Sequence, residues 1–220
     1  MPARPGILPA ERAAVAAACR RLAAGGLVYE TSGNVSLRAG EHVAITPTGG
    51  RLAELADEDV CVVDLAGTLV DGALAPTSEL DLHLGVYHRH GAGAVVHTHS
   101  PLATALGLVL DELPCVHYEM LGLGGTVPVA PYRTFGTPEL AETVLDALEG
   151  RPAALMANHG AIVHGSDMDE AVRRAEGLER ACELYWRAAA IGAPRTLDEQ
   201  ERRAVLDQAL AREYGATRRA

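Results

Sequence analysis

Hydrophobic positions along the chain alternate between helix-like and strand-like spacing. Between residues 11 and 24 the apolar residues recur at helical spacing and the pattern stops at two glycines, which predicts an amphipathic helix. Short β-branched runs separated by turn residues follow, and they predict strands at 27–29, 35–37, 43–46 and 60–64, with a hairpin turn at 38–41. The pattern therefore predicts a mixture of helices and short strands.

The chain after residue 76 continues the mixture of helical and strand-like patterns. Ser78 followed by Asp81 resembles a capping box, so we expect a helix to begin there and to run through Arg89. A strand containing His97 comes next, and Ser100 and Pro101 indicate the start of a short helix. Strand-like runs follow at 115–119 and 153–157, and helical patterns cover 137–150, 167–190 and 197–214. We expect the apolar stripes of the last two helices to lie in the core.

Composition limits the class of protein. The chain has 220 residues and no low-complexity linker, which favours a single domain spanning 1–220, with two tightly fused domains as the alternative. A net charge of −10 opposes nonspecific nucleic-acid binding, because phosphates would be repelled. The longest apolar runs are too short for a membrane span, and 1–9 lacks a signal-peptide core. The four cysteines are far apart, which favours free thiols and a cytoplasmic location.

Lysine is absent from the sequence, and all 19 basic residues are arginine. Without a side-chain amine there is no lysine Schiff base, no pyridoxal phosphate attachment and no Walker A lysine. The glycines at 122–125 do not follow the order of strand, glycine loop, helix and acidic residue, which excludes a Rossmann dinucleotide site. Any carbon–carbon chemistry in this chain must therefore use a metal ion.

Two histidines are the first candidates for metal ligands. His97 and His99 are two apart in a predicted strand, so their side chains leave the same face about 6.6 Å apart along the backbone. A catalytic Zn²⁺ site usually has three protein ligands, and His159, at a strand end beside a glycine, is a third candidate. The alternative is a strand end with one core histidine and one surface histidine.

Three segments rich in hydroxyl, amide and glycine residues are candidates for an anion site. The turns at 31–34 and 46–50 present donors without lysine, although each is also an ordinary turn. Thr77 and Ser78 lie at a predicted helix N-terminus, where free N–H groups bind phosphate. Glu79 follows in the first turn, and its alternative role is compensation of the helix dipole, worth about 0.3–1 kcal/mol.

Taken in order, these motifs resemble the class II aldolase/adducin family from about residue 10 to Tyr214. The resemblance is carried by Gly33-Asn34-Val35-Ser36, Thr46-Pro47-Thr48-Gly49, Thr77-Ser78-Glu79, His97-Thr98-His99, Pro131-Tyr132-Arg133-Thr134-Phe135-Gly136 and Asn158-His159-Gly160. It implies a three-layer α/β/α fold with a central, largely antiparallel sheet. It also implies a homotetramer with active sites between subunits.

The resemblance assigns roles to individual residues. It implies one Zn²⁺ per subunit, held by His97, His99 and His159, with Glu79 as a displaceable fourth ligand that becomes the catalytic base. The residues that would hold a substrate phosphate are Asn34, Thr48, Gly49, Thr77 and Ser78. Tyr118 and Tyr214 would act as catalytic residues in the site of a neighbouring subunit. One departure is Glu30, which stands where relatives often have glycine and which adds negative charge near the anion pocket.

The function implied is that of a zinc-dependent aldolase. Such an enzyme cleaves a phosphorylated ketose into dihydroxyacetone phosphate and an aldehyde through a metal-stabilised enediolate, with Glu79 as base and Tyr118 as proton donor. A decarboxylase, a dehydratase or a 4-epimerase acting on another sugar phosphate is the enzymatic alternative. An adducin-like interaction module is the alternative without catalysis.

Overall fold

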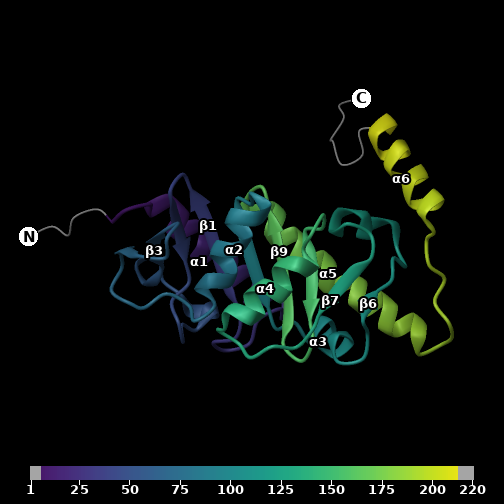
Figure 1. Ribbon diagram of the computed structural model, residues 1–220, viewed down its shortest axis with the longest axis horizontal. Coiled ribbons are helices and arrows are strands. Elements are labelled where there is room, and N and C mark those ends of the chain that lie inside the picture. Colours follow the sequence, from purple (N-terminus) through teal and green to yellow (C-terminus); the bar gives the residue numbers. More distant parts are fainter. Residues whose placement is uncertain (1–5, 213–220) are drawn as a thin grey trace, which may run out of the picture.

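A mixed sheet with helices on both faces forms the centre of the molecule (Figure 1). The computed structural model describes residues 6–212, and the strand order across these residues is β4-β3-β2-β1-β5-β9-β8-β7-β6. The strands are β1 (Asn34–Ala39), β2 (His42–Ile45), β3 (Cys61–Asp64), β4 (Leu69–Asp71), β5 (Ala94–Thr98), β6 (Glu112–Leu113), β7 (Val127–Ala130), β8 (Ala153–Met156) and β9 (Gly160–Gly165). Among these strands only β7 and β8 pair in parallel. The expected three-layer fold with a largely antiparallel sheet is confirmed.

Side chains that alternate along each strand supply two separate cores. In β5, Ala94 and Val96 belong to the core on one face of the sheet, and Val95 belongs to the core on the other face. The first face is covered by α1 (Pro9–Ala24), α3 (Pro101–Gly107) and α5 (Met168–Ala189). The second face is covered by α2 (Leu80–His90) and α4 (Pro138–Ala147), which pack against each other. Alternate residues along a strand therefore pack against different helices: one set contacts α1, α3 and α5, and the other contacts α2 and α4.

Most predicted elements are present, and the hairpin at 38–41 is confirmed by the pairing of Ala39 with His42. The segment 27–29 is not a strand, because Leu27 donates its N–H to Leu22 and the chain then turns. The segment 115–119 is not a strand either, since a 3-10 helix, η3 (Tyr118–Leu123), begins within it. Sequence spacing missed β4, β6, β7 and β9, which are short or contain glycine or proline.

Helix ends differ from the prediction at two places. Helix α2 begins at Leu80, and its N-cap residue Glu79 makes no capping hydrogen bond, so the expected box from Ser78 to Asp81 is wrong. The last helix, α6 (Glu199–Arg212), buries no residue and lies apart from the sheet (Figure 1), so its apolar stripe is not core. Among the described helices, none combines the length and apolar character required to cross a membrane.

Gly160, at the start of β9, allows a close approach between strands that another residue would block. A Cβ at Gly160 would lie 2.2 Å from the carbonyl oxygen of Thr98, whereas a Cβ at Gly177, on α5, would meet nothing within 4 Å. We expect Gly160→Ala to lower the free energy of unfolding by about 1–3 kcal/mol or more, and Gly177→Ala to raise it by about 0.4–1 kcal/mol. Urea unfolding of both variants measures the difference, and equal stabilities would contradict this account of the β5–β9 contact.

Candidate functional site

Strand β5 brings His97 to the face of the sheet that α2 covers. His97 is two residues after Val95 on β5, so its side chain points to the same face of the sheet. It pairs with Asn34 on β1, and the side chains of His97 and Asn34 both point toward the start of α2. His99 follows directly after β5. His159 precedes β9 in a turn where Asn158 adopts a left-handed conformation with φ 57°. Segments that are distant in sequence therefore meet at one end of the central strands.

The three predicted histidines form one cluster. Their ligand nitrogens all lie within 4.8 Å of one another, and within residues 6–212 this is the one group of three or more metal-binding side chains. The Nε2 atoms of His97 and His99 are 3.0 Å apart. Two donors bound tetrahedrally to Zn²⁺ are separated by about 3.3 Å, given ligand distances near 2.0–2.1 Å. The cluster therefore fits a tetrahedral divalent ion.

Glu79 completes this cluster from the start of α2. Its Oε2 lies 3.2 Å from Nε2 of His97, and its Oε1 lies 3.5 Å from Nε2 of His159. The side chain is buried, and Oε1 has no hydrogen-bond partner among the described residues. A buried carboxylate oxygen without a donor is costly, and a cation between these groups would compensate it. The carboxylate faces the histidines, which does not fit a role in capping the helix.

Backbone contacts and burial prepare the site for a cation. The Nδ1 atom of His97 donates to the carbonyl of Ala161 at 2.9 Å, which directs the lone pair of Nε2 into the cluster. Burial lowers the pKa of His99 to about 3 and that of His159 to about 4, and the neighbouring His97 acts in the same direction. Neutral imidazoles are the form that binds metal.

The ionisation of Glu79 is set by opposing effects. Burial on its own raises the pKa of Glu79. The nearby His97, the hydrogen bond from Asn34 and the nearby His159 together outweigh burial and hold the pKa below its ordinary value. Glu79 is therefore a carboxylate at neutral pH, and it can bind a cation or accept a proton.

A cavity of about 470 Å³ opens beside the cluster and holds all the predicted anion ligands. Its walls include Asn34, Thr48, Gly49, Thr77 and Ser78, together with Glu79, His99 and His159. Gly33 forms part of the wall with φ +91°, and a Cβ there would lie 2.7 Å from the carbonyl oxygen of His97. Glycine is therefore required where this turn crosses the end of β5.

The cavity is also lined by residues to which the sequence assigned no role. Arg133 lines it and is the only arginine among the described residues of its wall, and Tyr132 and Phe135 contribute exposed aromatic rings. The loop at 131–136 was part of the resemblance, but spacing along the chain gives no reason to place its arginine in the same cavity wall as Glu79. An anion in the cavity would meet a positive charge and several backbone and hydroxyl donors.

Glu30 does not add charge to this cavity. Its carboxylate pairs with Arg51 at 3.0 Å, and its side chain is absent from the described cavity wall. Its backbone has φ 53°, a left-handed conformation that glycine adopts at lower cost. Replacing the family's glycine with Glu30 therefore introduces backbone strain at this position. The negative charge that Glu30 was expected to add near the anion pocket is neutralised by Arg51.

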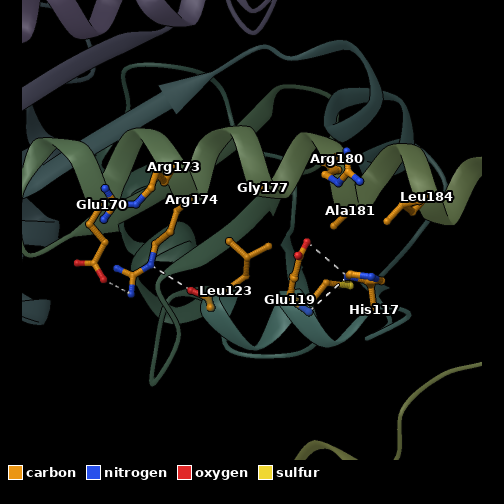
Figure 2. A pocket seen from close by; sticks show the side chains of 12 residues that line it. His117, Glu119, Leu123, Glu170, Arg173, Arg174, Gly177, Arg180, Ala181 and Leu184 are labelled. Carbon is orange, nitrogen blue, oxygen red and sulfur yellow. Dashed lines mark hydrogen bonds and ion pairs between the residues drawn. The ribbon is translucent and has the colours of Figure 1, made fainter. Parts of the chain in front are cut away.

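The predicted tyrosines lie outside this cavity. Tyr214 is beyond the described residues. Tyr118 is on η3, is 40% exposed and packs against the ring of His117. His117 lines a separate cavity of about 280 Å³, which Figure 2 shows between η3 and α5. Within one chain Tyr118 is therefore not brought to the histidine cluster.

The second cavity offers a different chemistry. Three arginines of α5 line it, namely Arg173, Arg174 and Arg180, and Figure 2 shows Arg174 extending toward η3, where it donates to the carbonyl of Gly122. Arg174 pairs with Glu170 at 2.9 Å, and His117 lies 3.7 Å from Glu119, so charges of both signs line the walls. The metal-type cluster and the buried carboxylate belong to the first cavity, which is the better candidate for catalysis.

Comparison with known proteins gives concordant results. Residues 13–186 match the family model described as "Class II Aldolase and Adducin N-terminal domain". A 5-deoxy-D-ribulose 1-phosphate aldolase of Bacillus thuringiensis is 38% identical over 89% of this chain and 93% of its own length. A 5-methylthioribulose-1-phosphate/5-deoxyribulose-1-phosphate aldolase of Rhodospirillum rubrum is 37% identical over 93% of each chain. The solved structure of an L-fuculose 1-phosphate aldolase superposes with a TM-score of 0.87 at 32% identity, covering 90% of this chain and 95% of that one.

The histidine cluster leads to a prediction about metal content. We expect protein loaded with Zn²⁺ and dialysed to retain about one ion per chain, and an ion at 100 times its Kd to stabilise the fold by about 2.7 kcal/mol. His159→Ala should lose most of the bound zinc, whereas His88→Ala, an exposed position on α2, should keep it. Elemental analysis and thermal unfolding measure both quantities. Equal zinc content in the two variants would refute this site.

Proposed function

The chain belongs to the class II aldolase and adducin family, and we propose that it is a metal-dependent aldolase that reversibly cleaves a ketose 1-phosphate into dihydroxyacetone phosphate and an aldehyde. The observation that carries this proposal is the position of Glu79. A buried carboxylate lies between a three-histidine cluster and a cavity suited to an anion. A noncatalytic interaction module has no need of that combination.

The proposed substrate is a short ketose carrying phosphate on C1 and an apolar end. The names of the similar enzymes support this class, since two of them act on 5-deoxyribulose 1-phosphate and one on L-fuculose 1-phosphate. A 5-deoxy sugar ends in a methyl group, and Tyr132 and Phe135 present exposed rings in the cavity wall. These rings are suited to contact the methyl end, and Arg133 with the hydroxyl donors is suited to bind the phosphate.

Each side chain then has a part in the reaction. Asn34, Thr48, Gly49, Thr77 and Ser78 bind the phosphate and orient the ketose. In the direction of synthesis, Glu79 accepts a proton from C3 of dihydroxyacetone phosphate, and in cleavage it returns that proton. A divalent ion, Zn²⁺ by preference, held by His97, His99 and His159, supplies a Lewis acid when it is bound.

The proposal also includes the assembly. Tyr118 is exposed and is not among the described residues that line the cavity of its own chain, which supports a role in the site of a neighbouring subunit of a homotetramer. There its hydroxyl would donate a proton to the aldehyde oxygen, and Tyr214 would help to exclude water. The four buried free cysteines support a reducing, cytoplasmic location for this single-domain enzyme.

A direct assay tests the reaction. We expect the zinc-loaded protein to release dihydroxyacetone phosphate from 5-deoxyribulose 1-phosphate or L-fuculose 1-phosphate, and Glu79→Gln to lower kcat by about 100-fold or more. The control is Glu112→Gln, an exposed carboxylate on β6, which should keep full activity. Coupled detection of triose phosphate measures cleavage. Loss of water from these ketoses, or an epimer without triose phosphate, would instead favour the dehydratase or epimerase alternative. The decarboxylase alternative would be favoured by release of CO₂ from a phosphorylated sugar acid, since these ketoses have no carboxyl group to lose.

Shared sites predict complementation between inactive chains. Glu79→Gln and Tyr118→Phe each remove one catalytic group, and mixed tetramers contain some interfaces with an intact Glu79 and an intact Tyr118 from the neighbour. We therefore expect refolding of the mixture to restore part of the activity. Native mass measurement confirms that mixed assemblies form. Mixed assemblies that stay as inactive as either parent would show that the sites are not shared.

A further inference from the structure

A chain of buried hydrogen bonds leads from the core to Glu79. The hydroxyl of Tyr87 lies 2.6 Å from Oγ of Ser36, and Oγ of Ser36 lies 2.6 Å from Nδ1 of His83. On the other side of the ring, Nε2 of His83 contacts Oδ1 of Asn34. The amide Nδ2 of Asn34 donates to Oε2 of Glu79 at 2.8 Å. Five side chains thus form one continuous relay.

Elements on two layers build this relay. Glu79, His83 and Tyr87 are spaced by four residues along the start and inner face of α2. Asn34 and Ser36 are two apart on β1, so both point to the face of the sheet that α2 covers. Ser36 and His83 have no exposed surface, and Tyr87 is 1% exposed. The relay lies among aliphatic residues of this core, where an unpaired polar group is costly.

Chemistry fixes the direction of every hydrogen bond. Glu79 is a carboxylate and accepts only, so the NH₂ group of Asn34 must face it and the amide oxygen must face His83. His83 must then donate from Nε2 and accept at Nδ1. Ser36 therefore donates to His83 and accepts from Tyr87. Burial, with His97 nearby, lowers the pKa of His83 to about 3, so the ring is neutral and has the single tautomer that the relay requires.

We propose that His83 is a positioning residue, which holds the amide of Asn34 so that its NH₂ group faces the carboxylate of Glu79. Ser36 and Tyr87 set the tautomer of His83 and so act one step further away. The inference rests on the proposed function for its catalytic consequence, because Glu79 is the proposed base. Without a donor at His83 the amide can turn over, and its oxygen would then face the carboxylate and repel it.

Asn34 gives the relay a second consequence. Its side chain lines the anion cavity and also holds Glu79, so one amide connects the proposed phosphate site to the proposed base. An amide held in one orientation presents its donors to both. The relay therefore affects the geometry of the reacting groups more than the affinity for substrate, which also depends on Thr48, Ser78 and Arg133.

The first test measures the tautomer of His83 in the unmutated protein without substrate. Nitrogen-15 NMR distinguishes a protonated Nε2 from a protonated Nδ1, and comparison with His83→Gln identifies the signals of this ring. We expect Nε2–H. A ring protonated at Nδ1 would reverse every hydrogen bond in the relay and would overturn the proposal. This measurement needs no activity, so it decides the direction of the relay even where the proposed aldolase reaction fails.

The second test separates positioning from loss of stability. We expect His83→Leu, which removes the donor, to lower kcat about 10- to 100-fold with a smaller change in KM and with unchanged zinc content. His83→Gln keeps an N–H donor and should recover part of kcat. The control is Val86→Ala, a fully buried position on the same helix but outside the relay, which lowers stability and should leave kcat unchanged.

The outcomes of the kinetic test are distinct. If the unmutated protein cleaves no ketose phosphate, the proposed function fails, and the tautomer result still decides the relay. If the unmutated protein is active and His83→Leu retains the kcat of Val86→Ala, the positioning role is refuted and the proposed function stands. If His83→Leu does not fold, the kcat of His83→Gln is compared with that of Val86→Ala. The glutamine amide does not reproduce the shape of the imidazole, so it should shift Asn34 and lower kcat, whereas Val86→Ala should not. Equal kcat values in these two variants would then refute the positioning role.

Discussion

A carboxylate buried with one oxygen unpaired is the constraint around which this structure is organised. Removing Glu79 from water is unfavourable unless donors or a cation face it, because a desolvated charge costs several kcal/mol, on the order of the whole stability of a domain. Asn34 satisfies one oxygen and the histidine cluster faces the other. The unpaired carboxylate oxygen that destabilises the fold in the absence of a cation also favours the binding of a cation.

The sheet satisfies this constraint through register. Asn34 and His97 are opposite each other on β1 and β5, and Thr98 pairs with Ala161 just beyond His159. A slip of one residue in either ladder would turn His97 toward the opposite helical layer, where α1 and α5 form an apolar core. The close approach of Gly33 and Gly160 to the backbone of β5 fixes the turns that complete the site. The relative positions of Asn34 and His97 are therefore fixed by the antiparallel ladder, while turns form much of the cavity wall.

The sequence predicts residues whose spacing has a direct geometric meaning. His97 and His99 are two apart on a strand, and a shared face follows from the pleat alone. The three histidines could be named as candidate ligands from the sequence pattern, whereas their assignment to one site and the three-layer, largely antiparallel fold came from the family resemblance. Ser36, His83 and Tyr87 were not anticipated, because each occupies a position that also suits an ordinary core residue. Their signal was the four-residue spacing of Glu79, His83 and Tyr87, which matters only once β1 is known to lie beneath α2.

Loops escaped prediction for a related reason. Nothing in the order of residues at 131–136 places Arg133 in the cavity that Glu79 also lines, since that depends on where the chain runs after β7. Yet the absence of lysine makes this arginine important in a chain of net charge −10. Among the described residues that line the cavity, the groups suited to an anion are one guanidinium, hydroxyl groups and backbone N–H groups at turns and before α2. A planar guanidinium binds two phosphate oxygens in a fixed orientation, as a lysine ammonium does not, so a site built this way constrains the direction of the substrate as well as its charge.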